Sequence, residues 1–254
     1  MTFGEQALGA SGDDARRILD LYGEAGGNVV ANAAGSHRKN LTLSLEERMR
    51  RLRTDYLDLY WVNLWDRHTP LEETMRALDD AVRAGKILYV GISDAPAWVV
   101  AQANTLADWR GWTPFAALQA PYSLLNRDIE RELLPMAETF GLTVAAWGPP
   151  ESLGPREHAA ARAVQEVADD LGATPAQVAI AWTRARSQAV HPIVGARTAE
   201  QLRDTLGALD LVLPADAVRR LDESTDFTLG FPGDFLAQAD SVFGEVAALV
   251  DGRQ

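Results

Sequence analysis

A short segment in the first half of the chain has side chains that could carry out acid–base chemistry. Asp66 and His68 stand two residues apart in the sequence WDRH, soon after an apolar run over residues 56–62. A carboxylate beside an imidazole can take up and release a proton near neutral pH. The same pair could instead cap the helix predicted to begin near Pro70. Asn63 ends the apolar run, and its amide can neither donate nor accept a proton at neutral pH.

Two further positions could supply a group for proton transfer. Asp94 follows the apolar run 88–92, where a buried carboxylate with a raised pKa could act as a base. The alternative is a capping residue before Pro96. Tyr122 follows the run 115–119 and could donate its phenolic proton. The spacing of His, Asp and Glu indicates no metal site.

A candidate anion site lies in the last third of the chain. Gly195, Ala196 and Arg197 stand just before a helix predicted over 199–207. The free backbone amides at a helix N-terminus point toward an anion, and an arginine adds positive charge. The alternative is an ordinary loop with a solvated Arg197.

Apolar runs alternate with amphipathic segments along the whole chain. Strands are predicted over 28–33, 56–62, 88–92, 115–119, 142–147 and 191–194. Helices are predicted over 13–25, 41–52, 71–84, 97–108, 128–140, 156–171, 175–186 and 199–207.

This alternation decides the expected fold class. Strand–helix units of roughly 30 residues indicate an α/β protein with a parallel sheet. Runs that are apolar on both faces indicate a sheet that is covered or closed. We expect one TIM-type (β/α) barrel domain over residues 1–254, with a C-terminal tail from about 226. A doubly wound sheet is the alternative, but no G-x-G-x-x-G follows a strand.

Composition excludes several classes of protein. The net charge of −12 argues against nucleic acid as a partner, because phosphate binding needs a basic face. No apolar run reaches the roughly 18 residues that span a bilayer, and no secretory signal is recognisable, so we expect no membrane partner. The absence of cysteine excludes disulfides and thiol nucleophiles and fits the cytoplasm. An Arg- and Ala-rich composition, with Lys39 and Lys86 as the only lysines, indicates a bacterial genome.

Several segments together resemble the aldo-keto reductase superfamily. They are TDYLDLYWV, LEETMRALDDAVRAGKILYVGIS, LQAPYSLLNRDIERELLPMAETFGLTVAAWGP and PIVGARTAEQLRDTLGALDLVL. LGFPGDFL also resembles the tail of its bacterial members. The resemblance runs nearly end to end. It implies a (β/α)8 barrel that binds NADP(H) and reduces carbonyl groups with an Asp, Tyr, Lys and His tetrad.

The tetrad of that family has no match in this sequence. Ala31 stands where the family has its Asp, and Asn63 stands where it has its His. Residues 34–37 lead directly into the next helix, so the second helix, the third strand, the Tyr and the Lys have no counterpart. We therefore expect an incomplete barrel with a shortened first strand. The gap would be closed by pairing of strands two and four, by a second copy of the chain, or by a loop.

The resemblance also implies a cofactor site. Arg197 resembles the residue that holds the 2′-phosphate of NADPH, and Gln201 also matches the family. Trp147 matches an aromatic residue that stacks on the nicotinamide. Ser93 and Gln119 match residues that contact the nicotinamide amide, although each could be an ordinary structural hydrogen-bonding residue.

Three departures weaken this cofactor site. Asp94 replaces an Asn, and a carboxylate cannot donate the hydrogen bond of the Asn amide. Residues 148–150 are Gly-Pro-Pro instead of Ser-Pro-Leu, and the loop that covers the pyrophosphate is reduced to about 151–155. NADP(H) binding is therefore expected in a weakened form or not at all.

Three functions remain open from the sequence. The favoured one is a non-redox enzyme that catalyses an acid–base elimination, isomerisation or cyclisation of a carbonyl-bearing small molecule at the barrel mouth, for example in specialised metabolism. Its candidate catalytic residues are Asp94, Tyr122, Asp66, His68 and Asn63. The second is an NADPH-dependent oxidoreductase with a rewired proton donor. The third is a pseudoenzyme that binds NADP(H) or a protein partner.

Overall fold

Six parallel strands form a single sheet in this computed structural model, which describes residues 33–34, 37–148 and 154–238. The strands are β1 (Ala33–Ala34), β2 (Leu57–Val62), β3 (Ile87–Ser93), β4 (Phe115–Pro121), β5 (Thr143–Trp147) and β6 (Val190–Pro192). Their order in the sheet is the same as their order in the chain, and every adjacent pair is parallel. This is the arrangement that repeated strand–helix units produce.

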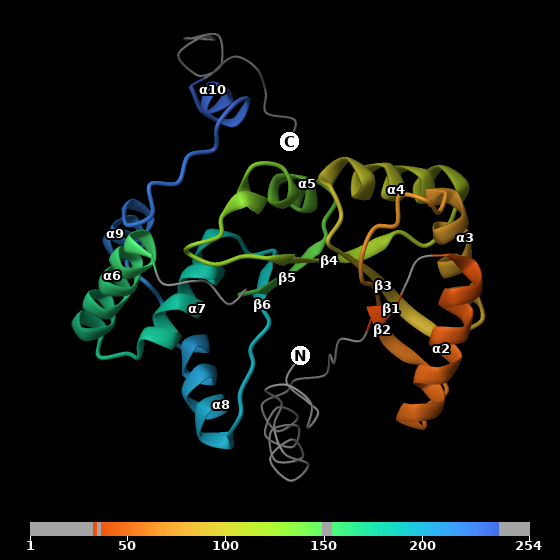
Figure 1. Ribbon diagram of the computed structural model, residues 1–254, viewed down its shortest axis with the longest axis horizontal. Coiled ribbons are helices and arrows are strands. Elements are labelled where there is room, and N and C mark those ends of the chain that lie inside the picture. Colours follow the sequence, from red (N-terminus) through yellow and green to blue (C-terminus); the bar gives the residue numbers. More distant parts are fainter. Residues whose placement is uncertain (1–32, 35–36, 149–153, 239–254) are drawn as a thin grey trace.

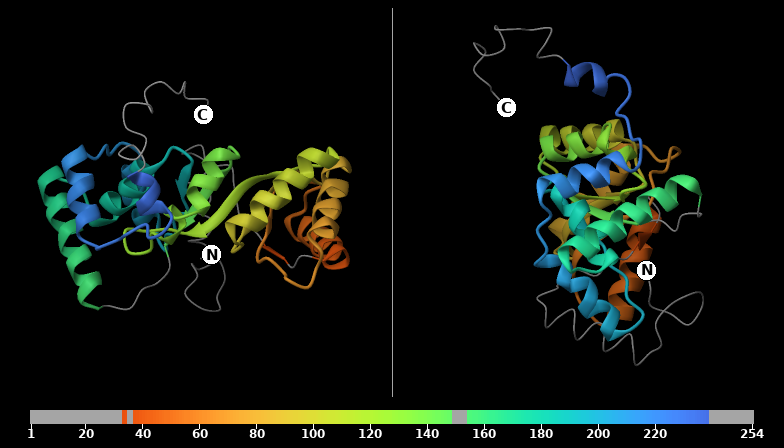
Figure 2. Two further views of the ribbon diagram at one scale, coloured as in Figure 1. Left: turned by 90° about the horizontal axis from the view of Figure 1, so that it is seen from above. Right: turned by 90° about the vertical axis from the view of Figure 1, so that its left-hand side faces the viewer.

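Helices connect the strands. Most of them gather toward two ends of the sheet, and α5 lies over its middle (Figure 1). They are α2 (Arg38–Leu52), α3 (Leu71–Arg83), α4 (Ala97–Arg110), α5 (Leu133–Thr139), α6 (Pro155–Leu171), α7 (Pro175–Arg186), α8 (Ala199–Leu206), α9 (Ala215–Glu223) and α10 (Gly233–Ala237). Short 3-10 helices are η1 (Asp128–Glu130) and η2 (Gly207–Leu209). Figure 2 shows α2, α3 and α4 together at one end and α6, α7, α8 and α9 at the other. No helix within these described ranges is both long and apolar enough to cross a membrane.

The sheet is an incomplete TIM-type sheet. Ala33 and Ala34 of β1 pair in parallel with Trp61 and Val62 of β2. These strands are the predicted strands two and four, so the pairing that we expected across the missing unit is present. Among the described residues no pairing joins β6 to β1, so the barrel is not closed there. Residues 28–32 of the predicted strand two, with Ala31, lie outside the described residues.

One prediction about the helices is wrong. Residues 128–140 do not form one helix, because η1 ends at Glu130 and α5 begins at Leu133. Glu132 between them has φ −143° and ψ −45°, which is not helical. Pro135 explains the break, since its ring would clash with the carbonyl group four residues earlier in a continuous helix. In the first turn of α5 it causes no such clash.

The helix-covered face of the sheet forms the main core. Its fully buried side chains include Tyr60, Val62, Val90, Ile92 and Leu118. Residues of the opposite face alternate with them, and Trp61 and Gly91 lie side by side there as register partners. Trp61 is only 2% exposed, so this face is also buried at its centre.

Candidate functional site

A row of polar and aromatic residues lies at the carboxyl edge of the sheet, where parallel α/β proteins place their ligands. Ser93 ends β3 and pairs in register with Gln119 of β4. Gln119 pairs with Ala145, and Pro121 pairs with Trp147 at the end of β5. Ser93, Gln119 and Trp147 therefore occupy successive strands at this edge, and we call them the carboxyl-edge row.

The groups of the carboxyl-edge row differ in burial. Ser93 is 3% exposed, whereas the side chains of Gln119 and Trp147 are half-buried. Among the described residues, neither the amide of Gln119 nor the indole of Trp147 has a hydrogen-bond partner. An amide that can both donate and accept, next to a half-buried indole, suits a planar ligand that carries an amide group.

Asp94 is exposed, so of the two alternatives for this position the buried base is wrong. The hydroxyl of Ser93 donates to Oδ2 of Asp94 at 3.0 Å, and the Asp94 backbone amide lies 3.4 Å from the carbonyl oxygen of Gln119. Asp94 has φ +49°, a left-handed conformation that Asp tolerates better than most residues. The chain turns sharply as it leaves β3, and sequence periodicity carries no signal for such a turn.

Asn63 is exposed directly after β2, at the same edge of the sheet. Val62, the residue before Asn63, pairs with Ile92, the residue before Ser93, so Asn63 and Ser93 are at the same level of the sheet. Asn63 therefore stands beside the carboxyl-edge row, where an amide can hold a polar group but cannot transfer a proton.

Tyr122 comes directly after β4 but has a buried side chain and a fixed partner. The residue is 2% exposed, and its hydroxyl donates to Oε1 of Glu130 at 2.8 Å. Its ring packs against Trp182 with ring centroids 5.5 Å apart. Burial raises the pKa of the Tyr122 phenol above its ordinary range, and the nearby Glu130 carboxylate raises it further. A phenol with a raised pKa is a weaker proton donor than the one that carbonyl reduction uses.

Glu130 belongs to a buried ionic network that sequence reasoning missed. Arg127 donates to both Glu130 oxygens, at 2.8 and 2.9 Å, and to Asp222 at 3.1 Å. Arg186 joins the same two carboxylates at 3.2 and 2.8 Å, and the Trp182 indole donates to Asp222 at 3.0 Å. The Arg127–Glu130 spacing in the sequence was a usable signal. Asp222, however, lies 95 residues from Arg127, and no local pattern connects them.

The Glu130 carboxylate stays charged although it is buried. Burial favours its protonated form, but hydrogen bonds from Arg127 and Tyr122 outweigh that effect and hold the pKa of Glu130 below its ordinary value. The side chains of Arg127 and Glu130 are only 6% and 8% exposed. The network fastens α9 to the loop after β4, and Glu130 is the partner of the Tyr122 hydroxyl.

Asp66 and His68 form a turn. Oδ1 of Asp66 accepts from the backbone amide of His68 at 2.9 Å, and Oδ2 accepts from the Thr69 hydroxyl at 2.5 Å. These bonds lower the pKa of Asp66, with the Thr69 hydroxyl as the largest cause. The His68 side chain is exposed. The contact between the two residues therefore runs through the backbone of a turn. The alternative that this pair caps the next helix is wrong, because Pro70 is the N-cap of α3 and no side chain bonds to it there.

The segment before α8 retains only part of an anion cradle. Oε1 of Gln201 accepts a hydrogen bond from the Arg197 backbone amide at 2.8 Å. The hydroxyl oxygen of Thr198 accepts one from the Gln201 backbone amide at 3.2 Å. Side chains thus take up two amides that an anion would otherwise use. Ala196 is buried, whereas Gly195 and Arg197 are exposed. The guanidinium group of Arg197 has no ion-pair partner within the described part of the chain and remains available to a phosphate.

A metal site is not seen in the parts of the chain that the structure describes, where no three His, Cys, Asp or Glu side chains converge. The groups that remain for ligand binding are the carboxyl-edge row, Asn63 and Arg197. They offer hydrogen bonds, an aromatic face and one positive charge. This set suits binding of a nucleotide-like ligand more than proton transfer.

Comparison with known proteins decides the family. The model of the aldo/keto reductase family matches residues 5–226, which is most of the chain. The chain belongs to the aldo/keto reductase family. A solved structure of a thermostable aldo-keto reductase, Tm1743, in complex with the inhibitor epalrestat superposes with a TM-score of 0.70. The two are 29% identical, over 84% of this chain and 78% of that one.

The relatives of this family member are named as a reductase and a dehydrogenase. It is 38% identical to a norsolorinic acid reductase of Emericella nidulans, over 83% of this chain and 59% of that protein. It is 32% identical to a probable aryl-alcohol dehydrogenase of Saccharomyces cerevisiae, over 89% of this chain and 77% of that protein. The chain thus spans about three fifths of the length of the norsolorinic acid reductases that it matches. The family predicted from the sequence segments is confirmed.

Proposed function

We propose that this chain binds NADP(H) at the carboxyl edge of its sheet and does not reduce carbonyl groups at the rates of its relatives. The observation that carries the proposal is the carboxyl-edge row, in which Ser93, Gln119 and Trp147 stand on three successive strands. NADP(H), when bound, supplies or takes up a hydride. In this proposal the row contacts the nicotinamide ring and its amide, while Arg197 neutralises a phosphate.

The second half of the proposal is that the site lacks a group that could donate a proton to a carbonyl oxygen. Carbonyl reduction needs a proton donor positioned at the carbonyl oxygen. The carboxyl-edge row contains a hydroxyl, an amide and an indole, and Asn63 beside it contributes another amide. The phenol of Tyr122 is bonded to Glu130. This arrangement supports a binding protein more than an NADPH-dependent oxidoreductase that uses Tyr122 as a donor.

Asp94 favours a second candidate function. It is an exposed carboxylate that accepts a hydrogen bond from the Ser93 hydroxyl at the carboxyl edge of the sheet. A carboxylate in this place could remove an acidic proton next to a carbonyl group. An acid–base enzyme acting on a carbonyl-bearing small molecule is therefore retained as the alternative, with Asp94 in place of the larger set of candidates.

A fluorescence titration with NADPH, and then a hydride-transfer assay with simple aldehydes, tests the proposal. We expect saturable binding, at least tenfold weaker in Arg197→Ala, and no aldehyde-dependent loss of NADPH. Arg219→Ala is the matched control, because Arg219 is also exposed and lies 4.0 Å from its nearest carboxylate, Glu223. The proposal is overturned if no NADPH binding is detected at the highest concentration of the titration. It is also overturned if the chain reduces aldehydes at an ordinary reductase rate. Equal affinity of the Arg197 and Arg219 variants removes Arg197 from the site.

The alternative has its own test. An acid–base enzyme would lose its activity on a carbonyl-bearing substrate in Asp94→Asn, whereas NADPH affinity would stay unchanged. Exchange of α-protons of simple ketones with solvent deuterium is a measurement that needs no cofactor. Exchange above the background rate that disappears in Asp94→Asn would favour the enzyme over the binding protein.

A further inference from the structure

A separate cavity lies between α2 and α3, on the outer side of the sheet. It has a volume of about 160 Å³, and we call it the α2–α3 cavity. Its apolar walls come from Leu41 and Leu45 of α2, Leu78 of α3, Ile87 of β3 and the ring of Tyr60 on β2. Ile87 is the first residue of β3, so the cavity reaches the amino end of the strands, opposite the carboxyl-edge row.

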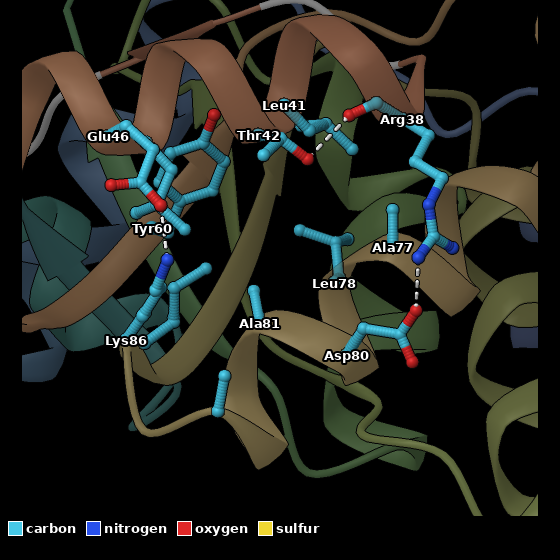
Figure 3. A pocket seen from close by; sticks show the side chains of 13 residues that line it. Arg38, Leu41, Thr42, Glu46, Tyr60, Ala77, Leu78, Asp80, Ala81 and Lys86 are labelled. Atoms are coloured by element: carbon cyan, nitrogen blue, oxygen red, sulfur yellow. Dashed lines mark hydrogen bonds and ion pairs between the residues drawn. The ribbon is translucent and has the colours of Figure 1, made fainter.

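The sequence of α3 explains why this space is not filled. Ala77 and Ala81 of α3 and Ala84, the exposed residue that caps the C-terminus of this helix, recur at helical spacing and all line the cavity. Methyl side chains facing Leu41 and Leu45 of α2 are too short to close the gap between the two helices. Figure 3 shows Ala77, Leu78 and Ala81 along one side of the opening, with α2 passing above them.

Two ion pairs stand at the ends of this opening. Arg38 donates to Asp80 at 2.7 Å, and Lys86 bonds to Glu46 (Figure 3). The side chains of Arg38 and Asp80 are 56% and 34% exposed, and those of Lys86 and Glu46 are 39% and 51% exposed. Exposed ion pairs contribute little to stability, so they can separate to admit a molecule.

Size and chemistry together select the ligand. We propose that the α2–α3 cavity binds one small monocyclic aromatic molecule about the size of benzene. An apolar cavity of roughly 150 Å³ takes up benzene. The α2–α3 cavity has a similar volume and apolar walls, but its mouth is open and is lined by charged side chains and the Thr42 hydroxyl. Leucine and isoleucine side chains supply apolar contacts, and the ring of Tyr60 supplies an aromatic one. The phenolic oxygen of Tyr60 points toward α2 in Figure 3, so the ring is the part of this residue that forms the wall.

The proposal is independent of the proposed function, because no residue of the cavity belongs to the carboxyl-edge row and Arg197 is on another element. Loss of NADPH binding would leave it standing. In the same way, an unoccupied cavity would not affect the cofactor proposal.

Benzene itself is the probe, and methyl resonances of leucine in the full chain are the readout. We expect saturable shifts of Leu41, Leu45 and Leu78 methyl groups, with half-saturation below about 1 mM. Ala81→Leu fills the cavity and should weaken binding at least tenfold. Ala161→Leu, on an exposed position of α6, adds the same side chain elsewhere and should leave binding unchanged.

Circular dichroism first checks that each variant is folded. If Ala81→Leu is not folded, Ala84→Leu serves as a second variant that fills the cavity. No saturable shift in the wild-type chain overturns the proposal. Equal binding by the filled and control variants also overturns it, because benzene would then occupy another place. Half-saturation well above 1 mM would mark an adventitious contact and likewise count against a built site.

Discussion

Trp61 lies directly on Gly91 across the β2–β3 pair. A Cβ atom placed on Gly91 would come within 2.5 Å of two ring carbons of Trp61, which is closer than side chains approach one another. The two residues are register partners, and Trp61 is 2% exposed. The indole therefore fills the centre of the sheet face opposite the helices, and it does so only because residue 91 has no side chain.

Gly91→Ala should destabilise the chain through this contact. The added methyl group forces the indole or the strand to move, and such overpacking costs about 1–3 kcal/mol of unfolding free energy. Urea unfolding monitored by tryptophan fluorescence measures the loss. Trp61→Phe combined with Gly91→Ala should recover part of it, because the smaller ring leaves room. A double variant that is no more stable than Gly91→Ala alone would contradict the proposed contact.

Glu130→Gln should be strongly destabilising, because it removes a charge from the buried network. Arg127 would keep only Asp222 as a carboxylate partner, and breaking a buried pair on one side costs about 3–5 kcal/mol. Glu132→Gln is the control, since Glu132 is exposed two residues away. Thermal unfolding of both variants gives the comparison. Similar melting temperatures for the two would show that the network adds little to stability.

The same network predicts how stability depends on pH. The folded-state pKa of Glu130 lies below its unfolded value of about 4.3, so the unfolded chain binds the proton more readily. The stabilisation by Glu130 is therefore present above that unfolded value and is lost as the pH falls through the folded pKa. We expect the stability difference between the wild type and Glu130→Gln to be constant from pH 7 to pH 5 and to shrink below about 4. A difference that grows on acidification would reverse the sign of this argument.

Tyr122→Phe should separate a structural hydroxyl from a catalytic one. Loss of the hydrogen bond to the charged Glu130 carboxylate should cost about 1.5–3 kcal/mol of unfolding free energy. NADPH affinity should stay the same. If any aldehyde reduction is detectable, it should also persist in Tyr122→Phe. A selective loss of reduction, with binding intact, would establish Tyr122 as a rewired proton donor.

The turn before α3 allows a test of Asp66 and His68. Asp66→Ala removes the acceptors of two hydrogen bonds and should lower the free energy of unfolding only modestly, because the turn lies at the surface. Asp66→Asn retains one carbonyl oxygen and should cost less. His68→Ala should be neutral in chemical denaturation because its side chain is exposed. A proton-exchange activity that disappears in His68→Ala would instead assign this pair a catalytic role.

Local sequence signals predicted most of the elements. The bounds predicted for α7 are the observed ones, and they agree with the capping box that Thr174 and Gln177 form and with Pro175 in the first turn. The position of the carboxyl-edge row at the ends of the strands was also predictable. The strand segments resemble those of the family, and this resemblance implies the same register between neighbouring strands. The order of parallel strands results from the repeated units.

Other features depended on contacts that sequence reasoning could not supply. The burial of Tyr122 depends on Glu130 and on Asp222, which lies far along the chain. The exposure of Asp94 depends on one left-handed backbone angle. Asp and Asn adopt that angle more often than most residues, but in only a minority of cases, so their presence does not predict it. Tertiary contacts and single dihedral angles therefore account for the errors at the candidate site.

The short β1–β2 joint has a consequence for how such molecules can change over time. Ala33 and Ala34 meet Trp61 and Val62 in the same parallel sense as every later pair of strands. A whole strand-and-helix module can thus be excised without reversing the direction of the chain or changing the handedness of the remaining modules. The missing unit therefore makes the sheet narrower by one strand position, while the direction of pairing between the remaining strands stays the same.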